Sequence, residues 1–337
     1  MKLESIPFVS IVIPTTGNVK FIKGLVESVS KLDYPKDKFE LILIGDEETK
    51  LLSLNSKRAK EYGIKTIVKY EPFAAGKKRN IGVELAKGQI IAFTDDDTIL
   101  KEDWISNAVR HLNDNNEYVG VGGPNFTPRE GLPFAKAVGR IFGSKFLFSF
   151  RYTIGHAKPK EIEHNPTCNY IIKKEVFKTV QFHDTLWPGE DAEFDIRVLK
   201  AGYKILYAPD VVVWHHRRSR PTAFLRQMFN YGKTRAQVTR MHPGSFDPRY
   251  FVFVFAFLIL ISLYYISWNK MDILGHHLAI TVPNFLLGAY FGILALAGLL
   301  VGYQTKKFKQ GLYAPLVLFI QHFGFSLGLV YGFLRKA

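Results

Sequence analysis

The sequence predicts an α/β protein: a mostly parallel sheet with helices on both faces, followed by a C-terminal region of three transmembrane helices. Up to about residue 215, short apolar runs alternate with stretches of helical spacing, an order typical of a parallel sheet covered by helices. From residue 249 on, three long apolar stretches without charged residues follow one another. Hydrophobic residues make up 47% of the chain, which excludes intrinsic disorder, and the single cysteine, Cys168, excludes an intramolecular disulfide.

Four continuous apolar runs predict strands that are buried on both faces: FVSIVIP (8–14), FELILIG (39–45), IKTIVKY (64–70) and QIIAFTD (89–95). Helical spacing between them predicts helices over 18–31, 50–62 and 75–87. Parallel sheets bind ligands at the carboxyl ends of their strands. The residues at those ends are therefore candidates for chemistry: Pro14 and Thr15 after the first run, Asp46 after the second, and Asp95 to Asp97 after the fourth.

Three adjacent carboxylates, Asp95, Asp96 and Asp97, end the fourth run. They repel one another unless a cation is present. Residues 95 and 97 point to the same side of an extended segment, so they can share one divalent ion. Oxygen ligands favour Mg²⁺ or Mn²⁺, which usually also coordinate substrate phosphates. The alternative is a solvated acidic turn that caps the following helix.

Four segments occur in a fixed order: VSIVIPTTGN, LILIGDEE, GKKRNIGVELAKGQIIAFTDDDT and PGEDAEFDIRVLKAGYKILYAP. In this order and spacing they resemble the inverting family-2 glycosyltransferases with the GT-A fold. The resemblance covers roughly residues 8–216, and its most specific block runs from Gly76 to Thr98. Two positions depart from the family pattern. Glu47 stands where a second Asp is frequent, and Thr16 where many members have an aromatic residue.

The resemblance implies roles for individual residues. Asp46 would contact the nucleoside of a nucleotide-sugar donor, a UDP- or GDP-sugar. Asp95 and Asp97 would hold a divalent cation, Mg²⁺ or Mn²⁺, and Asp191 of the Glu190-Asp191 pair would be the catalytic base. The full set of expected donor-binding residues is Pro14, Thr15, Asp46, Lys77, Arg79, Asn80, Asp95, Asp96, Arg226, Gln227 and Arg235.

The chemistry fits these residue types independently. Transfer from a nucleotide-sugar needs charge that stabilises the leaving diphosphate and a base for the attacking hydroxyl. Asp191 opens a helical stretch, AEFDIRVLKAG, whose N-terminal dipole keeps the carboxylate ionised. Direct displacement by the acceptor would invert the anomeric centre. Ordinary first-turn capping is the alternative interpretation of Glu190-Asp191.

The presence of a catalytic base favours a hydroxyl acceptor. A lipid phosphate acceptor is already ionised at pH 7, so its attack requires no base. We therefore expect a hydroxyl of a lipid-linked saccharide or a growing polysaccharide as the acceptor. One alternative is a polyprenyl-phosphate glycosyl synthase, whose usual pattern lacks the G-E-D before a helix. Another is a non-catalytic membrane protein that binds nucleotide-sugars.

His215 and His216 follow the last expected core strand, and related enzymes often place a metal-binding histidine there. Alternation along a strand lets only one of the two face the site, and we favour His216. The alternative is a pair of surface histidines beside a basic run.

Two stretches have the composition of helices at a membrane surface. Residues 217–248 form an amphipathic juxtamembrane segment, in which Arg226, Gln227 and Arg235 can approach a diphosphate while apolar neighbours meet lipid. Attraction to anionic lipids is the simpler interpretation. In residues 132–152 aromatic and aliphatic residues at helical spacing alternate with basic residues, which predicts an interfacial helix.

Three apolar stretches, about 250–268, 278–303 and 312–334, are long enough to span a bilayer. The division is then a GT-A-like catalytic domain over 1–216, the juxtamembrane segment and a transmembrane region over 249–337. Lys306, Lys307 and Lys309 between the second and third spans place that loop and the basic N-terminal part on the cytoplasmic side. Three spans put the C-terminus outside, so we expect a multi-pass protein of the cell membrane. The net charge of +15 could suggest a nucleic-acid partner, but three membrane spans explain basic juxtamembrane residues and no nucleic-acid-binding motif is present, so we expect none.

Overall fold

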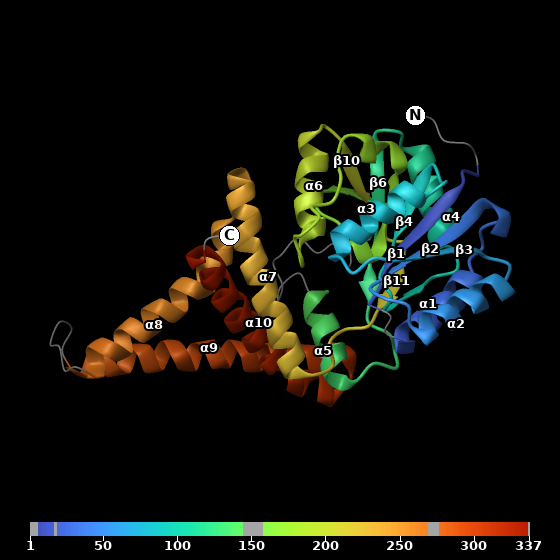
Figure 1. The fold of residues 1–337 in the computed structure, drawn as a ribbon. Helices are drawn as coiled ribbons and strands as arrows, with labels where there is room; N and C mark the ends of the chain where they lie inside the picture. Colours follow the sequence, from blue (N-terminus) through green and yellow to red (C-terminus); the bar gives the residue numbers. More distant parts are fainter. Residues whose placement is uncertain (1–5, 17–18, 144–157, 269–275, 336–337) are drawn as a thin grey trace. The chain divides into compact units, whose positions relative to one another are not determined.

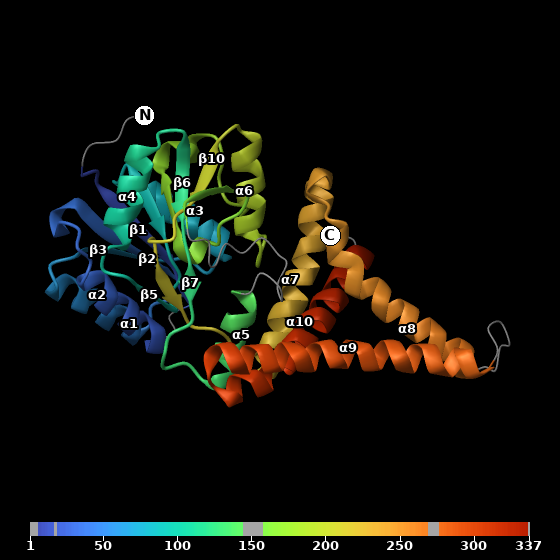
Figure 2. The same cartoon turned by 180° about the vertical axis from the view of Figure 1, so that it is seen from behind.

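The computed structural model describes residues 6–16, 19–143, 158–268 and 276–335. The chain divides into two compact units. The first contains residues 1–129 and 142–216, and the second contains residues 130–141 and 217–337. Figure 1 and, from behind, Figure 2 show the elements of each unit.

The first unit is built on a mixed, mostly parallel eight-stranded sheet, in the order β3-β2-β1-β4-β9-β6-β10-β8. β9 runs antiparallel to both its neighbours, and β8 runs antiparallel to β10 at the edge. A smaller sheet has the order β5-β11-β7. The strands are β1 (Val9–Pro14), β2 (Phe39–Gly45), β3 (Lys65–Tyr70), β4 (Ile90–Phe93), β5 (Thr98–Leu100), β6 (Tyr118–Gly122), β7 (Asn125–Phe126), β8 (Lys160–Ile162), β9 (Tyr170–Lys173), β10 (Lys204–Tyr207) and β11 (Val213–His215).

Helices cover both faces of the large sheet. One hydrophobic core includes residues of α1, α2 and α4, and a second includes residues of α3 and α6. Alternate residues of β1 enter the two cores: Ile11 and Ile13 the first, Val12 the second. The helices of this unit are α1 (Val19–Ser30), α2 (Lys50–Glu61), α3 (Ala75–Leu85), α4 (Trp104–Asp114) and α6 (Glu190–Lys200).

The predicted strands and helices form close to the predicted bounds, with one difference in burial. β1, β2 and β4 are buried along their whole length. β3, by contrast, is half-exposed, because it is the edge strand next to β2 and carries lysines at residues 65 and 69. The prediction that this run is buried on both faces was wrong. Ile67 packs against the second core and Val68 against the first, but both side chains are only partly buried.

Within its described residues, the second unit contains five α-helices: α5 (Pro133–Phe142), α7 (Pro221–Met241), α8 (Val252–Trp268), α9 (His276–Thr305) and α10 (Phe308–Leu334). Among the residues that the structure describes, three helices are long and apolar enough to cross a membrane, over Pro248–Ile266, Thr281–Thr305 and Phe308–Leu334. The three predicted apolar helices are thus confirmed. Only Lys306 and Lys307 separate α9 from α10, so Lys309 of the predicted loop lies inside α10.

α5 differs from the interfacial helix predicted over 132–152. Its apolar residues Phe134, Val138 and Ile141 are buried, and the Phe134 ring packs edge-on against Phe224 of α7 and Tyr313 of α10. Arg140 meanwhile remains exposed. The helix can therefore bury its apolar face in protein without burying its cations, which the sequence argument had not considered. Residues 144–152 lie outside the described residues.

Candidate active site

The predicted polar residues of the first unit meet at the carboxyl ends of β1, β2 and β4. Thr15 follows β1 and its N–H bonds to the Ile44 carbonyl of β2 (2.9 Å). The Thr15 hydroxyl donates to Asp96 Oδ2, which follows β4 (2.6 Å). The parallel pairing of β1 with both neighbours thus brings residues 15, 46 and 95–97 to one edge of the sheet.

Asp95, Asp97 and His215 form a cluster with the donor set of a cation site. One ligand atom of each residue lies within 4.8 Å of the others. The His215 imidazole Nε2 lies 3.0 Å from Asp97 Oδ1. Burial raises the pKa of the Asp95 carboxyl, Arg79 opposes this and Asp97 adds to it. Two carboxylates and an imidazole that converge in this way fit a divalent cation.

The cluster contains His215 rather than His216, so the preference for His216 is corrected. β11 pairs antiparallel with β5, and His215 is opposite Thr98, next to Asp97 in the chain. The next residue on an extended strand faces the other way. The His216 ring accordingly lies against the Phe21 ring, with centroids 4.8 Å apart. The backbone N–H of His216 donates to the Asp97 carbonyl (3.0 Å).

Arg79 of α3 connects the acidic cluster to the start of α6. Its guanidinium donates to Glu190 Oε1 (2.6 Å) and to Asp95 Oδ1 (2.9 Å), and its side chain is only 3% exposed. Burial lowers its pKa, but Glu190 and Asp95 more than offset this, so that the pKa of Arg79 lies above its ordinary value. Arg79 therefore stays charged and fixes the two carboxylates relative to each other.

Glu190 and Asp191 open α6 but have different surroundings. Glu190 is 5% exposed, and burial raises the pKa of its carboxyl although Arg79 opposes this. Asp191 is half-buried, and its Oδ1 accepts the N–H of Ala192 (2.8 Å). Gly189, with φ of 94°, turns the chain into the helix. Of the two carboxylates, only Asp191 is accessible to a substrate and outside the bridge through Arg79.

A second network joins Asp46 to Asp96. Lys78 of α3 forms an ion pair with Asp46 and donates to the Thr15 carbonyl (2.8 Å). The Thr15 hydroxyl in turn donates to Asp96. Burial raises the pKa of Asp96 to about 6, although the hydrogen bond from Thr15 acts to lower it. Lys78 is almost fully buried.

Lys78 is a residue that the sequence analysis missed, since it named Lys77. Lys77 instead pairs with Asp184 (2.8 Å), and both side chains are well exposed. The face of α3 decides between the two lysines. A Cβ at Gly82 would overlap Val12 Cγ1 of β1, so Gly82 faces the sheet closely. Lys78 precedes it by one helical turn and points to the same side.

The side chain of Asn80 forms hydrogen bonds with other residues of the protein. Its amide donates to the Phe182 carbonyl (2.8 Å) and its Oδ1 accepts the Phe182 N–H (2.9 Å). It also donates to Asp184 (3.1 Å). These bonds hold the segment that leads into Glu190-Asp191.

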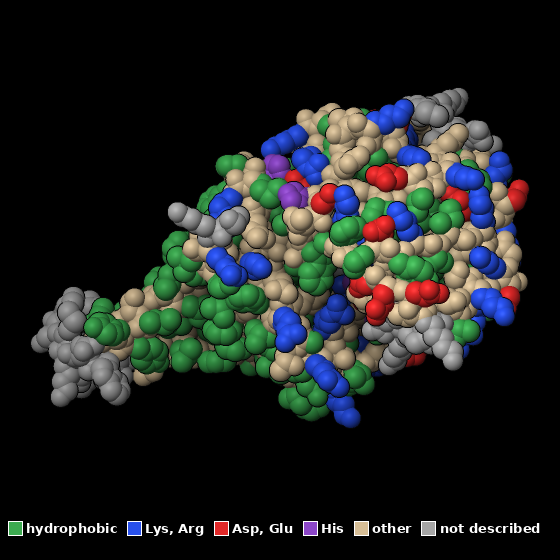
Figure 3. All heavy atoms as spheres, viewed as in Figure 1, with side chains coloured by type: hydrophobic (Ala, Val, Ile, Leu, Met, Phe, Trp, Pro, Cys, Tyr) green, Lys and Arg blue, Asp and Glu red, His purple; other side chains and the backbone are tan. Residues whose placement is uncertain are grey.

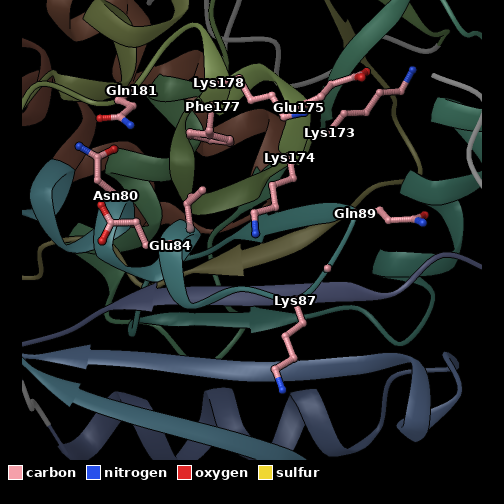
Figure 4. Close-up of a pocket in the computed structure, with 12 residues that line it drawn as sticks. Asn80, Glu84, Lys87, Gln89, Lys173, Lys174, Glu175, Phe177, Lys178 and Gln181 are labelled. Atoms are coloured by element: carbon pink, nitrogen blue, oxygen red, sulfur yellow. The ribbon is translucent and has the colours of Figure 1, made fainter.

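A cavity of about 490 Å³ lies beside α3, and it is not the acidic site. Gly88 and Gln89, which precede β4, line it, whereas Asp95 to Asp97 follow that strand. Its lysines do not converge. Lys174 donates to the Ala86 carbonyl (2.6 Å), and Figure 4 shows Lys173 and Lys174 pointing in different directions.

Three predicted donor-binding residues, Arg226, Gln227 and Arg235, belong to α7 in the second unit. Arg226 is exposed. Gln227 donates to the Tyr231 hydroxyl (3.3 Å), and the Arg235 guanidinium lies 4.9 Å from the centre of the Tyr250 ring. Their role toward a donor stays a prediction.

Comparison with known proteins identifies the family. Residues 10–181, just over half of the chain, match the family model described as glycosyl transferase family 2. The chain belongs to glycosyl transferase family 2. A second likeness concerns the fold: a mannosyltransferase from Pyrobaculum calidifontis, PcManGT, solved with GDP-Man and Mn²⁺, superposes with a TM-score of 0.56 at 18% identity, over 94% of this chain and 87% of that one. The predicted GT-A fold is confirmed.

Two curated relatives are similar to this chain over most of both sequences. Glycosyltransferase AglE of Haloferax volcanii is 25% identical over 77% of this chain and 82% of its own length. The dolichyl N-acetyl-alpha-D-glucosaminyl phosphate 3-beta-D-2,3-diacetamido-2,3-dideoxy-beta-D-glucuronosyltransferase of Methanococcus voltae is 23% identical over 96% of this chain and 98% of its own. The likeness to the Methanococcus voltae enzyme thus extends well beyond residues 10–181, the part that the family model matches.

Proposed function

We propose that this family-2 enzyme is a membrane-bound inverting glycosyltransferase. It moves a sugar from a nucleotide diphosphate donor to a hydroxyl of a lipid-linked saccharide or growing polysaccharide. The observation that carries the proposal is the convergence of Asp95, Asp97 and His215 at one edge of the sheet, with Arg79 joining Asp95 to the start of α6.

The acidic cluster supports a bound divalent cation. Asp95, Asp97 and His215 would hold it, and the imidazole favours Mn²⁺ over Mg²⁺, which prefers oxygen ligands. When bound, such an ion supplies positive charge that offsets the charge developing on the leaving diphosphate. PcManGT was solved with GDP-Man and Mn²⁺, which supports a nucleotide-sugar donor, and we propose a GDP- or UDP-sugar.

The residues of the chain divide the remaining work. Asp46, held by Lys78, would contact the nucleoside, and Thr15 and Asp96 line the same edge. Arg79 orders Asp95 and Glu190. Asp191 accepts the proton of the acceptor hydroxyl as that oxygen attacks the anomeric carbon from the face opposite the diphosphate. This single displacement inverts the anomeric centre.

The relatives support a lipid-linked acceptor. The name of the Methanococcus voltae enzyme describes transfer to a dolichyl N-acetylglucosaminyl phosphate, a sugar on a lipid carrier. Three apolar helices fit an enzyme that meets such an acceptor at a membrane. We place the enzyme in the cell membrane as a multi-pass protein, with the catalytic unit in the cytoplasm.

Asp191→Asn tests the proposal against a polyprenyl-phosphate glycosyl synthase. The variant keeps the shape of the side chain but removes the base. We expect transfer to a lipid-linked sugar hydroxyl to fall about 10³-fold, within the range of general base catalysis. Donor affinity should stay unchanged. Asp114→Asn, at the exposed end of α4, is the matched control. Full activity of Asp191→Asn, or transfer to a polyprenyl phosphate alone, contradicts the proposal.

A further inference from the structure

Two of the apolar helices need lipid around them. α8 exposes large apolar side chains on most of its circumference, including Phe255, Ile259 and Ile261. The first half of α9 does the same, with Phe285 73% exposed. α8 and α9 pack against each other, and the Tyr264 hydroxyl donates to Asn284 (2.7 Å). Figure 3 shows a largely hydrophobic surface over them. These features are typical of a spanning hairpin.

α10 differs, because one side of it is packed against α7. A Cβ at Gly328 would overlap the Phe229 carbonyl oxygen, and one at Gly232 would overlap the Phe325 carbonyl oxygen. The two backbones therefore touch. Arg240, near the end of α7, donates to the Gly332 (2.6 Å) and Arg335 (3.0 Å) carbonyls at the end of α10. The helices run parallel, and α7 stays with α10 over the second half of that helix.

The first half of α10 also packs against α9, where the Phe291 and Phe319 rings stack, and the side of α10 that neither helix covers is an apolar stripe. The exposed large side chains of α10 gather on one side of the helix: Phe308, Leu312, Tyr313, Leu316, Phe323, Leu327, Val330, Tyr331, Phe333 and Leu334. The α7–α10 pair thus presents apolar side chains from α10 and polar ones from α7. This is the amphipathicity of a helix that lies in the membrane interface.

α7 cannot follow α10 through a bilayer at low cost. It carries the cations Arg226, Lys233, Arg235 and Arg240 and no Asp or Glu. Charged side chains in the hydrocarbon region are costly. At the interface, the same cations meet lipid phosphates.

The ends of α10 give an independent argument. Lys306 and Lys307 precede it, and Arg335 and Lys336 follow it. Basic residues that flank a span favour the cytoplasmic side. Both ends of α10 satisfy this rule only if they lie on the same side of the membrane.

We propose that α10 lies in the bilayer interface, paired with α7, and that only α8 and α9 cross the membrane. The apolar stripe of α10 contacts acyl chains and the cations of α7 contact lipid headgroups. The C-terminus then lies on the same side as the first unit. A third span, as length and composition alone predict, places it on the opposite side.

Cysteine labelling distinguishes the two topologies. Cys168, the only cysteine, is buried, so the wild-type chain serves as the blank. Three single variants are expressed as the full chain in membranes, and Ala337→Cys is the one under test. Ser53→Cys, at an exposed position of α2, is the first-unit reference. Asp272→Cys, between α8 and α9 in the sequence, is the far-side reference. Sealed inside-out and right-side-out vesicles are then treated with a membrane-impermeant maleimide.

We expect the Ala337→Cys variant to be labelled from the side that labels the first-unit reference, at least tenfold more than from the side that labels the far-side reference. Labelling from the side of the far-side reference overturns the proposal, because α10 then crosses the membrane. Equal labelling from both sides, or labelling only after detergent, also overturns it. The readout needs no glycosyl transfer, so the proposed function and the topology can fail separately.

Discussion

The two units differ in what controls the position of their functional groups. In the first unit, parallel pairing of β1 with β2 and β4 fixes which residues meet at one edge. In the second unit, the apolar stretches of the sequence set the lengths of the helices. Close backbone contacts at glycines decide which of these helices pack together. Residues that directly follow neighbouring parallel strands can therefore be expected to lie together in a site. The hydropathy of an apolar helix, by contrast, does not indicate which helix packs against it.

The largest effect should come from the acidic cluster of the first unit. Asp97→Asn removes one charged ligand beside His215. We expect release of nucleoside diphosphate from the donor to fall about 10³-fold, since one group that stabilises developing charge is worth roughly 10²–10³-fold. Thermal unfolding should confirm a folded variant. Activity within about threefold of wild type would show that the cluster is not the site.

The close contact of the second unit gives the next effect. Gly328→Ala places a methyl group on top of the Phe229 carbonyl oxygen, so α7 and α10 must separate. We expect a loss of about 2 kcal/mol in the free energy of unfolding, typical of overpacking. Gly288→Ala in α9 is the control, because no atom lies within 4 Å of its Cβ. It should be neutral or stabilising by up to about 1 kcal/mol. Equal effects of the two variants would argue against the α7–α10 contact.

The adjacent lysines of α3 sharpen the comparison within the first unit. Lys78→Met leaves Asp46 and the Thr15 carbonyl without their cationic partner. We expect donor affinity, measured by calorimetry, to fall about tenfold, or about 1.4 kcal/mol. Lys77→Met breaks only an exposed pair, worth less than about 1 kcal/mol. A larger effect at Lys77 would overturn the assignment of the α3 faces.

The smallest effect concerns pH. Burial raises the pKa of Asp96 to about 6 and that of Asp95 above its ordinary value. The folded metal-free protein therefore takes up protons as pH falls through about 6, which stabilises it relative to its unfolded state. A cation competes with these protons. We expect the rise in unfolding temperature caused by Mn²⁺ to be smaller at about pH 5.5 than at about pH 7.5. An equal rise in unfolding temperature at the two pH values would show that the cation does not compete with protons at these carboxyls.

The strands at the centre of the first unit could be predicted because β1, β2 and β4 are continuous apolar runs that form where the runs lie. With them came Thr15, Asp46 and the aspartates after β4. His215 could not be chosen over His216, since the choice depends on the antiparallel register of β11 with β5. Lys78 could not be chosen over Lys77 without knowing which face of α3 meets the sheet. The half-burial of α10 depends on contacts with α7 and α9, which hydropathy does not contain.

The proposed activity is metal-dependent glycosyl transfer to a lipid-linked acceptor. Its most direct test is release of nucleoside diphosphate by the full chain in detergent, from a panel of GDP- and UDP-sugars. The assay is run with Mn²⁺ or a chelator, and with or without a membrane lipid extract. We predict turnover of one donor that needs both Mn²⁺ and the extract. Donor binding without turnover under every condition would contradict the account and favour a protein that only binds nucleotide-sugars.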